Sequence, residues 1–364
     1  MELEDDATIL IRIDPRLPRA DVDAIGARLI ASGALTPGFI PPGRGLLDLE
    51  GLAFAETMEG LPTVLLPDRN VVTRMARIAR DGTIGRDDPP SRLALDAMAF
   101  CQAANIDIEP LLAFQELAES MGDEVANEEL RWFRVADEGR ATAWIDLASG
   151  HSDRLPPLDA GPVEGVRLAK PPHRWRCNHA VMLKAASLEL DPTLTPVSRF
   201  EALVDWMRTD FILAGPAAVL SMMFLSPGAE RGGLVKGLRS PVRERALAGV
   251  RNAAWDATYL SELTRRARPE SYENARCIFA SADRTLAGLA PLLLIDAEDP
   301  VAHRNALSAH IGGWWGRDAE RVAGALLDAT AAVQDRPAPS GPPGVTDYVG
   351  LKIAEGEALV SRPI

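Results

Sequence analysis

The sequence predicts an α/β fold with a central parallel sheet flanked by helices. Two short apolar runs, at residues 63–66 and 276–282, have the composition of buried strands, and an acid follows each of them, Asp68 or Asp283. Segments with apolar residues at helical spacing separate the two runs. Strands joined through helical crossovers pair in parallel. We therefore expect these two runs to be neighbouring parallel strands.

Most of the remaining chain has a helical pattern. Apolar residues recur at helical spacing in residues 20–32, 71–80, 93–104, 110–121, 179–189, 197–209, 211–224, 242–266, 286–295, 304–310 and 318–333. Residues 7–13 have the pattern of a further strand. The length and this alternation of a few strands with many helices are compatible with one α/β domain with large insertions and equally with two domains.

Residues 130–175 break the helical pattern. Short β-like pieces at 132–135 and 143–147 precede a loop rich in Pro and Gly, which indicates an inserted β/loop segment. We therefore expect an N-terminal βα extension at 1–60, a main domain at 61–300 with an insertion at about 130–175, and a C-terminal helical extension at 301–364.

Composition restricts the class of protein and its partners. Of the 364 residues, 47% are hydrophobic and 25% are charged, as is typical of folded globular proteins. The net charge of −13 repels a polyanion, so a nucleic-acid site must be local and depend on a basic patch or on metal ions. The three cysteines are odd in number and widely spaced, which argues against a disulfide framework.

The same composition predicts a cytoplasmic protein without a membrane partner. The longest apolar run, residues 211–225, contains Pro216 and is shorter than the roughly 20 residues that span a bilayer. The N-terminus lacks the positive and apolar regions of a signal peptide.

The acids at the strand ends indicate a cation site. In open parallel sheets, ligands bind beyond the carboxyl ends of the strands. Asp68 and Asp283 both follow such an end. Carboxylate oxygens are the ligands that Mg²⁺ and Mn²⁺ prefer. Neighbouring strands would therefore bring two acids within reach of one divalent ion.

Three short motifs resemble those of the PIN-like nuclease superfamily. The first strand of that family ends in Asp-x-Asn before an apolar residue, as in Asp68-Arg69-Asn70-Val71. Its mid-helix acid is similar to Asp256 in Asn252-Ala253-Ala254-Trp255-Asp256, and its strand-terminal Thr-x-Asp-x-x-Leu motif is similar to Ser281-Ala282-Asp283-Arg284-Thr285-Leu286. The chain resembles a larger, insertion-bearing member.

The resemblance implies a three-layer PIN-like fold and a set of site residues. The metal-binding and catalytic acids would be Asp68, Glu116, Asp256 and Asp283, with Glu119 and Glu129 as rivals of Glu116. Asn70 and Asn252 would orient the carboxylates. The basic stretch at 231–251 would supply phosphate contacts through Arg239, Arg243 and Arg245.

Each of these residues also has a structural interpretation. Asp68 and Asp283 could be helix N-caps, and a run of charges is usually a solvated face. His173, Cys177 and His179 have a spacing that could suit zinc, but no fourth ligand lies close in the sequence. No Gly-rich phosphate loop is present.

We therefore expect an endonuclease that cleaves single-stranded nucleic acid, RNA rather than DNA, with water activated by Mg²⁺ or Mn²⁺. The alternative is a non-catalytic protein that uses a PIN-like scaffold to bind a partner protein or to regulate another protein. Clustered carboxylates favour the enzyme, whereas carboxylates that are separated or paired with Arg favour the scaffold. A protein partner or a homo-oligomer is compatible with both.

Overall fold

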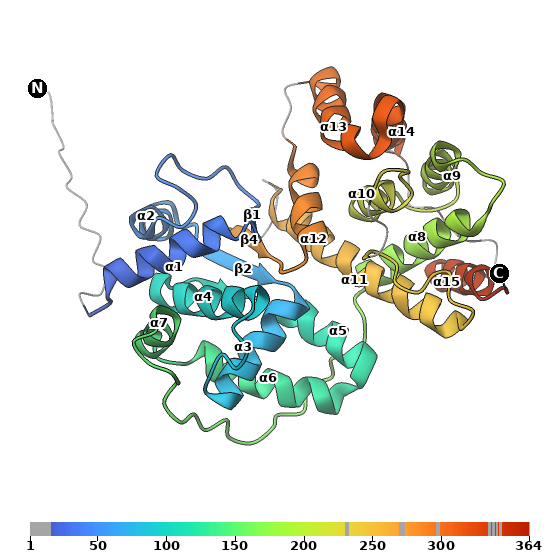
Figure 1. Cartoon of the computed structure of the whole chain (residues 1–364). Helices are drawn as coiled ribbons and strands as arrows, with labels where there is room; N and C mark the ends of the chain where they lie inside the picture. The colour runs from blue at the N-terminus through green and yellow to red at the C-terminus, as the bar shows by residue number, and fades with distance from the viewer. Residues whose placement is uncertain are drawn as a thin grey trace, which may run out of the picture. The chain divides into compact units, whose positions relative to one another are not determined.

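The computed structural model of the protein describes residues 16–229, 233–268, 274–295, 299–333, 336, 339, 341 and 344–363. The chain forms two compact units (Figure 1). The first unit contains Met1–Ala169 and Arg266–Ala282, and the second contains Lys170–Arg265 and Asp283–Ile364. The strand expected at residues 7–13 lies outside the described residues, as does Arg231 of the basic stretch.

The first unit is a mixed α/β structure, as the sequence predicts at this level. Its elements are α1 (Arg19–Ala31), β1 (Leu35–Pro37), α2 (Leu49–Glu59), β2 (Thr63–Pro67), α3 (Arg69–Asp81), α4 (Pro89–Ala104), β3 (Asp107–Ile108), α5 (Leu111–Met121), α6 (Asp123–Asp137), α7 (Ala141–Ser149) and β4 (Arg276–Ala280).

Within the described residues, the sheet has the strand order β1-β4-β2-β3. β2 pairs in parallel with β4 over its whole length, from Thr63 opposite Arg276 to Pro67 opposite Ala280. β3 pairs in parallel with the other side of β2, and β1 closes the sheet antiparallel to β4. The predicted parallel pairing of the two apolar runs is therefore confirmed.

The apolar composition of β2 and β4 follows from their central place. Leu66, Ile278 and Phe279 are fully buried, and strands covered on both faces are apolar throughout rather than alternating. Helices α3, α4, α5 and α6 pack against one another, and α1 and α7 pack against α4 (Figure 1). The sheet and these helices share one core.

The expected β pieces of the insertion are helices. Residues 132–135 lie in α6, and residues 143–147 lie in α7. The buried side chains of α6 include Ala126, Phe133 and Ala136, whose spacing follows the helical repeat. The short windows at 132–135 and 143–147 contain fewer than two helical turns, so β-branched and aromatic content misled the prediction. The loop that follows, rich in Pro and Gly, is present as expected.

Within its described residues the second unit is helical. Its elements are α8 (His173–Leu190), α9 (Pro196–Thr209), α10 (Gly215–Phe224), α11 (Arg243–Arg266, whose last residue belongs to the first unit), α12 (Arg284–Leu289), the 3₁₀ turns η1 (Ala290–Leu294) and η2 (Gly316–Asp318), α13 (Pro300–Trp315), α14 (Ala319–Val333) and α15 (Tyr348–Val360).

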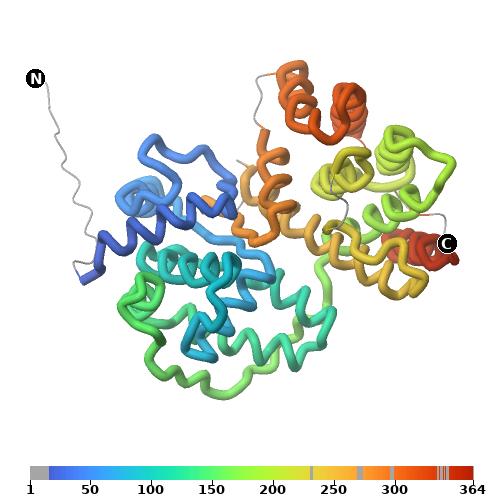
Figure 2. Tube along the Cα trace, in the orientation of Figure 1, coloured from blue at the N-terminus to red at the C-terminus, as the bar shows by residue number. Residues whose placement is uncertain are grey.

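The two units have different boundaries from the expected division at residues 60 and 300. Val22, Ile25 and Leu29 of α1 belong to the core of the first unit rather than to an extension. At the other end of the chain, α15 packs along α8, as the red and green tubes in Figure 2 show. Gly356 permits this approach, because a Cβ there would lie 2.6 Å from the Cβ of Leu183. The helices α1 and α15 therefore pack into their respective units.

No helix among the described residues combines the length and the apolar character that crossing a membrane requires.

A tight chain crossing in the second unit predicts a specific sensitivity to substitution. A Cβ on Gly249 of α11 would lie 2.0 Å from the carbonyl oxygen of Lys236. Gly249→Ala should therefore lower the free energy of unfolding by about 1–3 kcal/mol through overpacking. Thermal and denaturant unfolding measure this loss.

Gly288→Ala in α12 is the matched control, because nothing lies within 4 Å of a Cβ built there. It should leave stability unchanged or raise it by up to about 1 kcal/mol, since Ala favours helix over Gly. Equal stability of the two variants would show that the crossing at Gly249 is not tightly packed.

Candidate functional site

The carboxyl edge of the sheet brings Asp68 next to the chain that leaves β4. Asp68 follows the last residue of β2, and its backbone N–H donates a hydrogen bond of 2.9 Å to the carbonyl of Ala280, the last residue of β4. Pro67 and Ala280, the last residues of β2 and β4, lie opposite each other. The residues that follow them, Asp68 and Ser281, are therefore neighbours. This arrangement joins segments 213 residues apart in the sequence.

The carboxylate of Asp68 is buried and held at both oxygens. Its Oδ1 accepts a hydrogen bond of 2.9 Å from the backbone N–H of Val71, which makes Asp68 the N-cap of α3. Its Oδ2 accepts one of 2.5 Å from the hydroxyl of Ser281. Asp68 is only 2% exposed. The capping interpretation is thus correct, and the carboxylate also has a fixed orientation.

Glu116 on α5 is another buried acid of the first unit. Its Oε1 lies 3.5 Å from Nη1 of Arg69, the residue after Asp68. This contact and the packing of α3 against α5 bring Glu116 to the start of α3. The rival Glu129 on α6 instead accepts a hydrogen bond of 2.7 Å from the hydroxyl of Thr73, one turn further along α3. The other rival, Glu119, is half-buried on α5.

The other two predicted acids belong to the second unit. Asp283 is the N-cap of α12, and its Oδ1 accepts hydrogen bonds from the backbone N–H groups of Thr285 and Leu286. Asp256 lies on α11, one turn after Asn252, whose Nδ2 is 3.5 Å from Oδ2 of Asp256. The four acids are therefore divided between the units, and their joint site stays a prediction. In the described part of the chain, no three His, Cys, Asp or Glu side chains are grouped to hold a metal ion.

The two asparagines differ in their surroundings. Asn252 lies beside Asp256, as expected for an orienting residue. Asn70 is exposed, and only its backbone carbonyl takes part in a side-chain contact, with Arg74. The hydroxyl that orients Asp68 comes from Ser281 instead. The signal for Ser281 in the sequence was its position directly after an apolar strand, which matches that of Asp68.

Two of the three predicted phosphate-binding arginines have structural partners within the second unit. Arg239 pairs with Oε1 of Glu189 at 3.0 Å, and Arg199 pairs with the other oxygen of that buried carboxylate at 2.7 Å. Arg243 donates to the carbonyls of Leu238, Ser240 and Val360. Arg245 is exposed. The buried carboxylate of Glu189 and the three backbone carbonyls need hydrogen-bond donors, and the guanidinium groups of Arg239 and Arg243 supply them.

The acidic surplus is confined to the first unit. That unit holds 32 of the 52 Asp and Glu residues but only 19 of the 39 Lys and Arg residues. The second unit therefore has no net charge. The net negative charge of the first unit as a whole attracts cations and repels polyanions.

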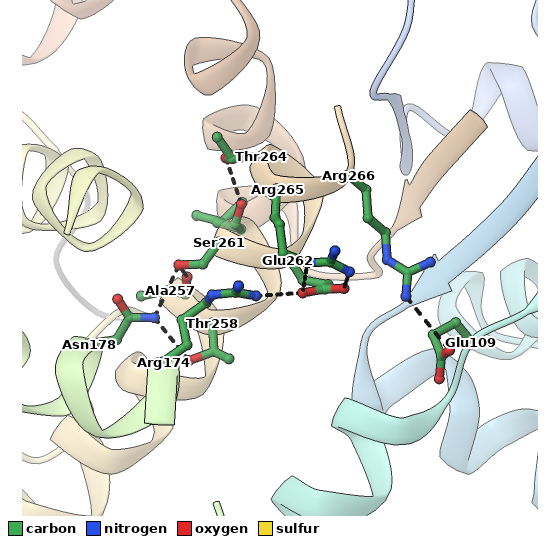
Figure 3. Close-up of polar contacts among 11 residues, drawn as sticks. Glu109, Arg174, Asn178, Ala257, Thr258, Ser261, Glu262, Thr264, Arg265 and Arg266 are labelled. Atoms are coloured by element: carbon green, nitrogen blue, oxygen red, sulfur yellow. Dashed lines mark hydrogen bonds and ion pairs between the residues drawn. The ribbon is translucent and has the colours of Figure 1, made fainter. Parts of the chain in front are cut away.

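A polar cluster on α8 and α11 was not indicated by the sequence (Figure 3). The buried carboxylate of Glu262 accepts a hydrogen bond of 2.6 Å from Arg174 and forms an ion pair with Arg265. Asn178 donates to the hydroxyls of Thr258 and Ser261. The next arginine along the chain, Arg266, belongs to the first unit, where it lies 3.7 Å from Glu109.

His179 of α8 is buried, and its ring packs against that of Trp175. Its ring centroid lies 4.7 Å from that of Trp175, which in turn lies 5.5 Å from that of Trp255. Neither ring nitrogen of His179 has a hydrogen-bond partner among the described residues. Burial, and then the charge of Arg251, lowers the pKa of His179 to about 4. Its apolar surroundings are those of a packed core rather than of a zinc site with Cys177.

This pKa makes the stability of the second unit dependent on pH. The pKa of histidine in an unfolded chain is about 6.5, above the folded value of about 4. Neutral His179 therefore contributes stability that is fully present above pH 6.5 and is lost as the pH falls toward 4. The loss reaches up to about 3 kcal/mol.

The measurement is the free energy of unfolding of the parent and of His179→Gln between pH 7 and 4.5. The variant should lose less stability over this range than the parent. His310→Gln, at an exposed histidine of α13, should follow the parent. Parallel curves for all three proteins would show that His179 does not titrate in this way.

Comparison with known proteins gives no match: no family model fits the chain, and neither a curated protein nor a solved structure is similar to it.

Proposed function

We propose that this protein is a metal-dependent phosphodiester hydrolase with a PIN-like fold, acting on single-stranded nucleic acid, with RNA as its expected substrate. The observation that carries the proposal is the parallel pairing of β2 and β4, with the buried, oriented carboxylate of Asp68 at their carboxyl edge. That edge is where open parallel sheets bind ligands. The motifs around Asp68 and Asp283 add the resemblance to PIN-like nucleases.

The residues at this edge suit a hard cation. Asp68 and Glu116 offer carboxylate oxygens, and Mg²⁺ is commonly held by one or two carboxylates while it keeps several waters. Val71 and Ser281 donate hydrogen bonds that fix the orientation of the Asp68 carboxylate. Carboxylates that bind metal ions are commonly oriented by hydrogen bonds of this kind. Asp256 and Asp283 are the further ligands that the resemblance implies. The bound ion would lower the pKa of a water molecule and stabilise charge on the phosphate.

A second candidate function is binding of a partner protein without catalysis. The pairing of Glu116 with Arg69 favours it, because an arginine already supplies the positive charge that a cation would bring. The internal partners of Arg239 and Arg243 also leave fewer guanidiniums for phosphate. A basic partner would suit the acidic first unit.

Asp68→Asn separates the two functions. The substitution removes the charge, keeps the volume, and retains an N-cap, since Asn caps helices as well as Asp. Cleavage of single-stranded RNA and DNA with Mn²⁺ should fall by at least about 100-fold, because loss of an outer orienting partner alone costs 10- to 100-fold. Stability should change by less than about 1 kcal/mol.

Asp88→Asn is the matched control, because Asp88 caps α4 in the same unit through the N–H of Ser91. The Asp88→Asn variant should cleave nucleic acid as the parent does. Removal of the metal ion with a chelator should abolish cleavage by the parent. Absence of Mn²⁺-dependent cleavage by the parent, or full activity of Asp68→Asn, would reject the nuclease and leave the binding protein.

Ser281→Ala tests the orientation of Asp68. Loss of the hydroxyl should weaken Mn²⁺ binding by about 10- to 100-fold, because outer partners of a ligating carboxylate have effects of this size. It should also lower stability by about 1–3 kcal/mol, since a buried acceptor loses its donor. Calorimetric titration with Mn²⁺ measures the first effect.

Ser120→Ala, at an exposed serine of α5, is the control and should bind Mn²⁺ as the parent does. If Ser281→Ala loses stability but binds Mn²⁺ normally, the serine only satisfies a buried cap and Asp68 is not a ligand.

A further inference from the structure

A second candidate site lies in the first unit, and none of the acids of the proposed nuclease lines it. It is a pocket of about 440 Å³ between the end of α6, the start of α7 and the loop after α7. This volume is within the range of small-molecule sites. Val135, Ala143, Leu155, Pro156, Pro157 and Leu158 give it an apolar wall.

The loop wall of this pocket is fixed to the rest of the unit. The backbone N–H of Leu155, which is 5% exposed, donates a hydrogen bond of 2.8 Å to the carbonyl of Gly82. Further along the loop, the carbonyl of Gly161 accepts one of 2.8 Å from Arg131 of α6. The pocket is therefore formed before any ligand arrives, which reduces the entropy that binding costs.

One wall residue carries a hydrogen-bond donor that no described residue satisfies. Trp144 lines the pocket and is 1% exposed. Its Nε1 lies beside Gly139, another wall residue, because a Cβ on Gly139 would come within 2.7 Å of that nitrogen. No described residue accepts a hydrogen bond from this N–H. This nitrogen is not among the fully buried side-chain groups that lack a partner in the described part of the chain, so water reaches it and a ligand oxygen can take the place of that water.

Charged groups of both signs line the pocket. Arg140 lines the pocket at the start of α7, whose first turn has no side-chain cap. Its guanidinium forms no ion pair with a described carboxylate. Glu138 and Asp159 also line the pocket, and Asp159 is fixed by a hydrogen bond of 3.0 Å from the N–H of Gly161. The pocket thus offers donors, carboxylates and an apolar wall together.

We propose that this pocket binds a free α-amino acid with an apolar side chain. The ligand carboxylate would accept from Arg140 and from Nε1 of Trp144, and its ammonium group would lie between Glu138 and Asp159. Its side chain would pack against Leu155 and the two prolines. An apolar α-amino acid carries the three chemical groups that this lining complements, whereas a nucleotide phosphate would meet two carboxylates.

Calorimetric titration of the whole protein with L-phenylalanine and L-leucine tests this proposal. 3-Phenylpropanoate, which lacks the ammonium group, and phenethylamine, which lacks the carboxylate, are the comparison ligands. Each should bind at least about 10-fold more weakly than L-phenylalanine, because each leaves one set of charged hydrogen bonds unmade.

Arg140→Gln should weaken the binding of L-phenylalanine about 10-fold and leave the affinity for phenethylamine, which has no carboxylate, unchanged. Trp144→Phe, which removes the N–H and keeps most of the ring, should act in the same direction. Arg134→Gln is the matched control, because Arg134 is an exposed arginine of α6 outside the pocket lining. Asp68→Asn should bind L-phenylalanine like the parent, so failure of the nuclease proposal would not affect this test.

Two results would overturn the proposal. The first is no binding of either amino acid by the parent at millimolar concentration. The second is equal affinity of the parent and Arg140→Gln for L-phenylalanine, with circular dichroism showing both folded.

Discussion

The pairing of β2 with β4 is the constraint on which the first unit depends. β4 lies between β1 and β2, so the sheet would be divided without it. The register of the pair also decides which residues leave the sheet at the same point, and it places Asp68 beside Ser281. A shift of one residue would turn the apolar side chains of β4 to the opposite face. The fold and the proposed site therefore depend on the same ladder of hydrogen bonds.

Buried charges account for much of the remaining architecture. A carboxylate that leaves water must find donors, because its desolvation is costly. Asp96 of α4 is 2% exposed and pairs with Arg28 of α1, and Glu189 of α8 is 3% exposed and pairs with Arg199 of α9. Each pair fixes two helices in place. Arg28 and Arg199 are thus engaged with buried carboxylates, and these two charges are not available to a polyanion.

The sequence predicted the secondary-structure elements whose apolar residues recur at the spacing of the element and are buried in the structure. It predicted β2 and β4, their parallel pairing, and most helices, because apolar residues occur there at the spacing of the element. It did not predict β3, which has only two residues, or α2, whose exposed Phe54 and Met58 interrupt the usual pattern. Such elements are too short or too irregular for periodicity to identify them.

Prediction of the candidate site was limited by contacts distant in the sequence. The acid after β2 was evident, and its role as an N-cap follows from its position before α3. That Ser281 holds Asp68 depends on a contact across 213 residues, which no local pattern records. Glu189 and Val360, which bind Arg239 and Arg243, are also distant from them in the sequence. The sequence alone therefore predicted an exposed basic surface where these arginines have internal partners.

The discontinuity of both units has a consequence for how the chain folds. During synthesis, β2 emerges long before β4, and the residues of the second unit up to Arg265 are made in between. Until β4 arrives, one edge of β2 has no partner, and an unpaired apolar edge is a template for aggregation. Contacts of such high sequence separation also form slowly. The newly made chain therefore passes through a stage in which the first unit is incomplete while residues 170–265 of the second unit have already been made, and the unpaired edge of β2 exposes this stage to aggregation.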